Sequence, residues 1–228
     1  MSTEFEITMP EEVPVMTLPK VAFFPQALLP LHIFEPRYRL MLTEVLATNR
    51  LLAIAGLRPS LVRRPGDEPP YRVAGIGIIR ACQKNDDGTS NLLLQGLGRV
   101  AITAIVAEEP FRRIRIQPLA SEPGAAQEVN QRSRAELARL LGVKRRLAAQ
   151  KSGELASFLK TIDDPETFVD IAAFSLCESP ALKQKLLETL DVHRRLALFT
   201  GQVRAEIGVL RVQRKLQGKI KDGEVGLN

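Results

Sequence analysis

Two cysteines and two histidines are the side chains that could form a nucleophile and its base. His32 with Cys177, or His193 with Cys82, would supply a thiol and the imidazole that activates it, provided that the pair lies within hydrogen-bond reach. Their spacing along the chain does not place either pair together. Two histidines are also too few for most histidine-built metal centres, and no Cys-x-x-Cys pair occurs. We therefore expect no catalytic residue, no metal site and no disulfide framework.

Two glycine-containing segments bear on nucleotide binding, GIGIIR at residues 75–80 and GLGR at residues 96–99. Neither fits the Gly-x-Gly-x-x-Gly fingerprint, because each lies in a strand pattern with no helix after it. Bulges or the close approach of another backbone explain these glycines better. The sequence also has no Gly-x-x-x-x-Gly-Lys-Ser/Thr phosphate loop, so we expect no cofactor.

The first half of the chain predicts short strands around a single helix. Apolar and alternating patterns indicate strands at residues 13–18, 27–33, 51–57, 71–84, 91–95, 99–107 and 111–118, with GLGR as an interruption. The helix covers residues 36–49 and has Pro36 at its first position. Residues 58–70 form a proline-rich loop, and Asn-Asp-Asp-Gly at residues 85–88 signals a hairpin turn. Such strands with glycine kinks indicate a small closed or half-closed barrel.

The second half predicts helices. Asp164, Ser179 and Asp191 are typical helix caps, and proline follows the first two. The last helix carries an apolar stripe spaced by four and three, made of Val192, Leu196, Phe199, Val203, Ile207 and Leu210. We therefore predict an α+β fold with two modules. Residues 1–120 form a β pseudo-barrel with one inserted helix, and residues 127–221 form an α-helical bundle that ends in a long helix.

Composition indicates a globular chain with a basic second half. Hydrophobic residues make up 45% and charged residues 25% of the sequence. Residues 1–126 hold 14 Lys and Arg against 13 Asp and Glu, a net +1, whereas residues 127–228 hold 18 against 13, a net +5. The basic half suggests RNA as a ligand, but 5% aromatic residues and no Trp leave few stacking platforms. Nucleic acid is therefore not the expected partner.

The amino terminus and the hydropathy pattern bear on location. Residues 1–12 are acidic and lack the apolar run of a secretory signal. No stretch of 18 apolar residues occurs, so we expect no membrane span. A cytoplasmic location is expected by elimination.

Four segments, in order, resemble the amino-terminal domain of Lon proteases. They are VMTLPKVAFFPQALLPLHIFEPRYRLML at residues 15–42, GIGIIR at 75–80, LLLQGLGRVAI at 92–102 with its Gly-x-x-Arg element, and residues 164–196 with Lys183 and Gln184. The similarity spans about residues 13–200. This resemblance implies a pseudo-barrel related to the PUA domain, followed by helices. It also implies a role in contacting substrate polypeptides and adaptors.

A full Lon protease continues into an ATPase module and a Ser–Lys peptidase module, and no segment of this sequence resembles either. We therefore expect a non-catalytic polypeptide-recognition protein, not an enzyme, that resembles the Lon substrate-binding region. Its expected partners are unfolded or degron-bearing polypeptides, with a separate ATP-dependent protease as a further candidate. The alternative is a PUA-like RNA-binding module that uses the basic carboxyl-terminal half.

Four residues near the first helix are candidate polypeptide contacts. Phe23 and Phe24 flank a proline-bound loop in a very apolar segment, and the alternative is that they belong to the core. Arg37 and Tyr38 follow the proline that starts the helix, and the alternative is that they hold the helix to the sheet.

The end of the last helix is a candidate docking surface for a partner, an acidic surface or a second copy of the chain. Its apolar stripe continues through Val209, Val212, Leu216 and Ile220, and it is interleaved with Arg211, Arg214 and Lys215. The alternative is a solvated helix end whose cations complement the helix dipole.

Overall fold

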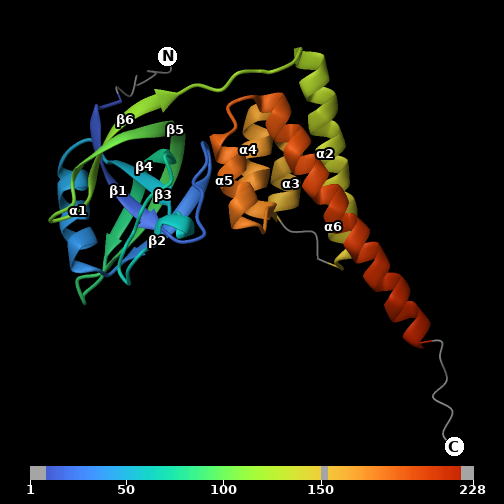
Figure 1. The fold of residues 1–228 in the computed structure, drawn as a ribbon, viewed down its shortest axis with the longest axis horizontal. Coiled ribbons are helices and arrows are strands. Elements are labelled where there is room, and N and C mark those ends of the chain that lie inside the picture. The colour runs from blue at the N-terminus through green and yellow to red at the C-terminus, as the bar shows by residue number, and fades with distance from the viewer. Residues whose placement is uncertain (1–8, 150–153, 222–228) are drawn as a thin grey trace, which may run out of the picture. The chain divides into compact units, whose positions relative to one another are not determined.

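The structure, a computed structural model, describes residues 9–149 and 154–221, with side chains described up to residue 216 (Figure 1). Its strands are β1 (Glu12–Leu18), β2 (Leu28–Ile33), β3 (Leu51–Gly56), β4 (Val73–Lys84), β5 (Ser90–Ala107) and β6 (Arg113–Leu119). Its helices are α1 (Pro36–Ala47), α2 (Gln127–Leu147), α3 (Glu154–Thr161), α4 (Pro165–Leu176), α5 (Pro180–Glu188) and α6 (Val192–Lys221), with a 3-10 turn at Pro59–Leu61.

The chain forms two compact units. The first comprises Met1–Ser121 together with Asp170–Leu190, and the second comprises Glu122–Val169 together with Asp191–Asn228. The division between them falls within α4. All the strands lie in the first unit, which is called the barrel unit below.

The barrel unit is built on a mixed sheet in the order β2–β5–β4–β3–β1–β6. Strand β5 also pairs with β6, which closes β5, β4, β3, β1 and β6 into a ring and leaves β2 beside β5. Only β1 and β3 run parallel among these pairs; the others are antiparallel. The predicted α+β fold, with a β pseudo-barrel and one inserted helix ahead of further helices, is confirmed.

The core of the barrel follows from side chains that point inward from every strand of the ring. Strand β3 is buried along its whole length, as its continuous apolar run predicts. The buried cluster consists of Val13, Val15, Leu51, Ala53, Ala55, Ala74, Ile76, Val100, Ile114 and Ile116.

The glycines of β4 and β5 give room to another segment of backbone. GLGR does not end a strand, because β5 runs unbroken from Ser90 to Ala107. The expected bulge is present there, since Ile76 lies opposite Gly98 and Gly77 opposite Gly96. A Cβ atom at Gly75 would lie 2.1 Å from the carbonyl oxygen of Phe23, and one at Gly96 would lie 2.0 Å from that of Phe24. The expected close approach of a backbone is therefore confirmed at these two positions, where any side chain would collide with main-chain atoms.

Helix starts follow the predicted caps. The backbone N–H of Thr167 donates to Asp164 (2.7 Å), and that of Arg194 donates to Asp191 (2.8 Å). The Ser179 hydroxyl accepts from the backbone of Leu182 at the start of α5 (3.3 Å). In the second unit α2 and α6 run side by side (Figure 1), and the stripe from Val192 to Ile207 is buried as predicted.

The segment Asp170–Leu190 belongs with the strands because buried polar contacts join it to them. The guanidinium of Arg99 on β5 donates to the Asp170 carboxylate (2.6 Å) and to the Leu187 carbonyl (3.1 Å). The side-chain amide of Gln184 donates to the Val73 carbonyl on β4 (3.1 Å). These contacts cross the predicted boundary, and the division into modules at residues 1–120 and 127–221 stays a prediction.

The buried pair makes a stability prediction. The side chains of Arg99 and Asp170 are 2% and 1% exposed. Replacing Asp170 with alanine leaves the guanidinium buried without its carboxylate, so the free energy of unfolding should fall by about 3–5 kcal/mol. The measurement is equilibrium unfolding in urea. Arg204→Ala is the matched control, because its 2.6 Å pair with Glu136 is largely exposed and should contribute no more than about 1 kcal/mol. Equal losses in the two variants would contradict the assignment.

Candidate polypeptide-binding surfaces

Phe23 and Phe24 lie inside the barrel unit. Both side chains are 0% exposed, and the guanidinium carbon of Arg99 stands 5.8 Å from the ring centre of Phe24. The segment reaches this position because Gly75 and Gly96 leave space for its backbone. Burial removes both phenylalanines from any surface that a partner can touch. It corrects the hypothesis that they contact a polypeptide and favours the core alternative.

Arg37 and Tyr38 hold the start of α1. Arg37 forms a two-bond pair with the Glu68 carboxylate (2.6 and 3.0 Å) and a third bond with Glu35 (2.9 Å). Its guanidinium carbon lies 4.4 Å above the ring centre of Tyr38, which is 6% exposed. The geometry favours a positioning role for both residues, while the 40% exposed side chain of Arg37 leaves one edge accessible.

A second arginine fixes the loop at residues 58–70. Arg112 donates to the Thr17 hydroxyl (3.0 Å), to the Glu68 carbonyl, and to the Glu108 carboxylate (2.8 Å). Glu68 is therefore held through its side chain by Arg37 and through its backbone by Arg112. These contacts give the loop a defined position beside the barrel.

An open groove of about 650 Å³ lies between this loop and β5. Its lining residues are Leu61, Gly66, Asp67, Glu68, Pro69, Pro70, Tyr71, Arg72, Ile102, Thr103, Ala104, Ile105, Glu108 and Arg112. Sequence reasoning identified only a proline-rich loop here. The available signal was an adjacent pair of prolines ahead of a strand. Prolines have no backbone N–H and cannot donate hydrogen bonds to a neighbouring strand.

Other apolar side chains are exposed on the barrel unit. Leu28 on β2 is 52% exposed and Phe34, just after β2, is 61% exposed. The rings of Phe34 and His32 stack with centres 6.1 Å apart. In the groove, Leu61 and Ile105 are 43% and 44% exposed. Exposed apolar groups of this size are candidate contact points for a partner.

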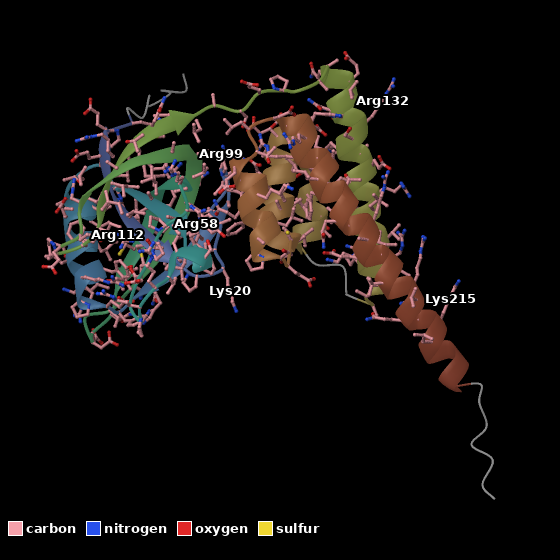
Figure 2. The ribbon with its side chains drawn as sticks, viewed as in Figure 1. Lys20, Arg58, Arg99, Arg112, Arg132 and Lys215 are labelled. Carbon is pink, nitrogen blue, oxygen red and sulfur yellow. The ribbon has the colours of Figure 1, made fainter. Side chains whose placement is uncertain are left out.

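The end of α6 exposes the predicted stripe. Val209, Val212 and Leu216 are each more than half exposed. Arg211, Arg214 and Lys215 are exposed as well, and the Ile220 side chain lies outside the described residues. Arg214 donates to the Arg146 carbonyl near the end of α2 (3.1 Å), and Figure 2 shows Lys215 on the part of α6 that continues past α2. A docking role for these residues stays a prediction.

The two histidines are hydrogen-bonded to asparagines. The Nδ1 atom of His32 lies 2.8 Å from the Asn91 side-chain oxygen, and that of His193 lies 3.1 Å from the Asn130 side-chain oxygen. Over residues 9–149 and 154–221, no group of three or more His, Cys, Asp or Glu side chains could hold a metal ion. In the same residues, every helix is too short or too polar to cross a membrane.

Lys183 and Gln184 both make contacts within the barrel unit. The Lys183 ammonium donates to the Phe174 carbonyl in the last turn of α4 (2.6 Å), where a cation complements the helix dipole. Gln184 joins α5 to β4 through the bond to Val73 and also donates to Glu188 (2.8 Å). Burial lowers the pKa of Lys183. Lys183 therefore joins α5 to α4, and Gln184 joins α5 to β4.

The comparison with protein families matches residues 12–204 to the ATP-dependent protease La (LON) substrate-binding domain. The match covers most of the chain, and the chain belongs to this family. The match is to the substrate-binding domain and not to the ATPase or peptidase modules of Lon.

The curated relatives include whole Lon proteases. A Lon protease of Desulfosudis oleivorans is 28% identical over 217 residues, which are 94% of this chain and 26% of that protein. A Lon protease of Trichlorobacter lovleyi is 28% identical over 230 residues, 99% of this chain and 28% of that protein. The chain thus spans about a quarter of the length of the relatives it matches.

Solved structures show the same fold. The amino-terminal domain of Mycobacterium avium complex Lon protease has a TM-score of 0.64 and 22% identity, and the match covers 85% of this chain and 98% of that one. A Lon N-terminal domain protein from Xanthomonas campestris has a TM-score of 0.56 and 18% identity, with 82% and 95% covered.

The environment of Tyr38 makes a titration prediction. Burial raises its pKa above the ordinary value of 10.0, the Glu68 carboxylate adds to this, and Arg37 opposes it. The sequence has two tyrosines and no Trp, so in Tyr71→Phe the phenolate absorbance reports Tyr38 alone. The Tyr38 phenol should titrate above the ordinary range. The stability associated with the neutral phenol should be fully present below the pKa that Tyr38 has in the unfolded chain. It should be lost as pH rises through the higher pKa that Tyr38 has in the folded chain. A phenol that titrates at or below the ordinary value would contradict the described burial.

Proposed function

We propose that this chain binds polypeptides in extended or unfolded states and does not itself cleave them. The observation that carries the proposal is the match of residues 12–204 to the Lon substrate-binding domain. Exposed apolar groups on the barrel unit, including Leu28, Phe34 and Ile105, support it, because such groups can contact apolar segments that folded proteins bury.

The proposal extends to partners of two kinds. Unfolded or degron-bearing polypeptides are the proposed ligands, and a separate ATP-dependent protease is a proposed recipient of them. A non-catalytic role and a cytoplasmic location are part of the same hypothesis. Contacts through separate exposed apolar groups favour modest affinity for many ligands.

The first test is binding of an unfolded probe. Fluorescein-labelled, reduced and carboxymethylated α-lactalbumin should raise its fluorescence anisotropy on titration with the chain, with a dissociation constant on the order of micromolar. Native α-lactalbumin with its disulfides intact is the control and should not bind, because its apolar segments are buried. Equal responses to both probes, or no response to either, would contradict the proposal.

We also propose that the exposed stripe of α6 docks a second copy of the chain. In sedimentation velocity at about 50 µM, a concentration at which weak contacts are populated, the wild-type chain should contain dimers. The double variant Val212→Lys with Leu216→Lys should be monomeric, because added charge prevents burial of the stripe. Val129→Lys, which alters a 40% exposed valine on α2, is the control and should dimerise. A monomeric wild-type chain would overturn self-association.

A further inference from the structure

Beyond Ala101, strand β5 has a neighbouring strand on one side only. Its pairing with β4 ends at Val73 and Ala101, and the next hydrogen bond on that side runs from the Ile102 N–H to the Arg72 carbonyl (2.7 Å). On the opposite side, pairing with β6 continues to Ala107. Within the part of the chain that the structure describes, no strand pairs with the other side of residues 103–107.

The segment before β4 leaves this edge open because it pairs elsewhere. The Pro69 carbonyl accepts from the backbone of Arg58 (2.8 Å), and the Tyr71 N–H donates to the Gly56 carbonyl (2.9 Å). Pro70 forms an isolated bridge with Leu57. Two adjacent prolines also have no N–H to offer a carbonyl of β5. The edge is therefore unpaired because of local sequence, and the loop beside it is held at a distance that forms the groove.

The groove runs along the backbone of β5 rather than across one face of it. Four consecutive residues from Ile102 to Ile105 line it. Thr103 lies at a bulge, so the side chains here do not alternate strictly between faces, but four successive lining residues follow the direction of the strand. The opposite wall consists of residues 66–72 with Leu61, and Arg112 and Glu108 complete the lining; Figure 2 labels Arg112 within the barrel unit.

The groove offers apolar contacts beside the open edge. Leu61 and Ile105 are each exposed by more than two fifths, and the partly buried Tyr71 lies with them in the lining. An added strand presents alternate side chains to each face. Apolar side chains at alternate positions could therefore contact Ile105 and Leu61 while the main chain pairs with β5.

One cation of the groove, Arg72, is available to an acidic side chain in the ligand. Glu68 and Glu108 are paired with Arg37 and Arg112, and Asp67 accepts two N–H groups from its own loop. Arg72 is exposed, and no hydrogen bond or ion pair of its guanidinium occurs among the described residues. This cation at the point where pairing with β4 ends is available to a carboxylate.

Two bulges limit what can pair with the edge. The β5–β6 register shifts between Ile102 and Ala104 and again between Ile105 and Ala107. Bulges twist an edge and discourage long, indiscriminate pairing. The stretch that remains fits a short strand rather than another sheet.

We propose that the open edge of β5 at residues 103–107 captures a short extended polypeptide segment as an added strand. The segment carries apolar side chains at alternate positions and an acidic side chain that pairs with Arg72. This inference rests on the proposed polypeptide binding and specifies its ligand, because main-chain hydrogen bonds supply binding that is independent of most side chains.

The direct test uses a pair of peptides that differ only in main-chain hydrogen bonding. The probe is a fluorescein-labelled octapeptide of alternating Val and Thr in which one Thr is replaced by Glu. In the first control, every odd-numbered backbone nitrogen carries a methyl group, and in the second control every even-numbered one does. Whichever register the peptide takes, one of the two controls therefore lacks the N–H groups that face β5. Binding to the wild-type chain should weaken about tenfold or more for at least one methylated peptide, because methylation removes strand donors.

Matched protein variants locate the site. Ile105→Lys and Leu61→Lys should each weaken octapeptide binding about tenfold, whereas Leu40→Lys, which alters a 51% exposed leucine of α1 outside the groove lining, should leave it within about twofold. Arg72→Glu should weaken binding of the Glu-containing peptide, and Arg132→Glu, an exposed arginine of α2, is its charge-matched control. Circular dichroism establishes that each variant is folded, and Leu61→Lys, at an exposed position of the 3-10 turn, provides the result if Ile105→Lys does not fold.

The outcomes separate this inference from the proposed function. If carboxymethylated α-lactalbumin binds but the groove variants and methylated peptides behave like their parents, strand addition at β5 is overturned and polypeptide binding stands. Strand addition at β5 is also overturned, and polypeptide binding stands, if the unfolded protein binds and the octapeptide does not. If neither probe binds the wild-type chain, both ideas fail together.

Discussion

Arg99 and Asp170 form the contact on which the rest of the barrel unit depends. A guanidinium and a carboxylate removed from water are each destabilising alone, and they are tolerated only where each meets the other with good geometry. That requirement ties one position of β5 to one position of α4. The Leu187 carbonyl, near the end of α5, accepts a further bond from the same guanidinium. The helical segment Asp170–Leu190 is therefore held on the strands, and Gln184 adds a second attachment at β4.

The ring of strands is closed, but one edge of β5 stays open. Closure of the ring through β5 and β6 satisfies most strand edges within the molecule. The same long strand that closes the ring continues past its β4 partner, since residues 69–71 pair with residues 56–58 instead. An unpaired backbone edge therefore lies beside a loop that Arg37 and Arg112 hold in place. This loop beside an open strand edge provides main-chain groups and side-chain contacts in one groove.

Much of the fold could be predicted from the sequence because its signals are local. Asp164, Ser179 and Asp191 cap helices at the expected positions, and the continuous apolar run of β3 is buried on both faces. The groove could not be predicted in this way, because it depends on which strands are neighbours and where their pairing stops. Phe23 and Phe24 illustrate the same limit: an apolar pair beside prolines suits a surface loop or a core equally well. Two glycines far along the chain decide in favour of the core.

The barrel unit of this Lon substrate-binding domain chain is proposed to contact extended polypeptide at the edge of β5. Hydrogen–deuterium exchange of the full chain, with and without saturating carboxymethylated α-lactalbumin, tests this contact without any substitution. Slower exchange is expected for amides of residues 103–107, with the loop at residues 66–72 as the next most protected segment. Unchanged exchange in both segments, while the probe is bound and protection appears only elsewhere, would contradict it.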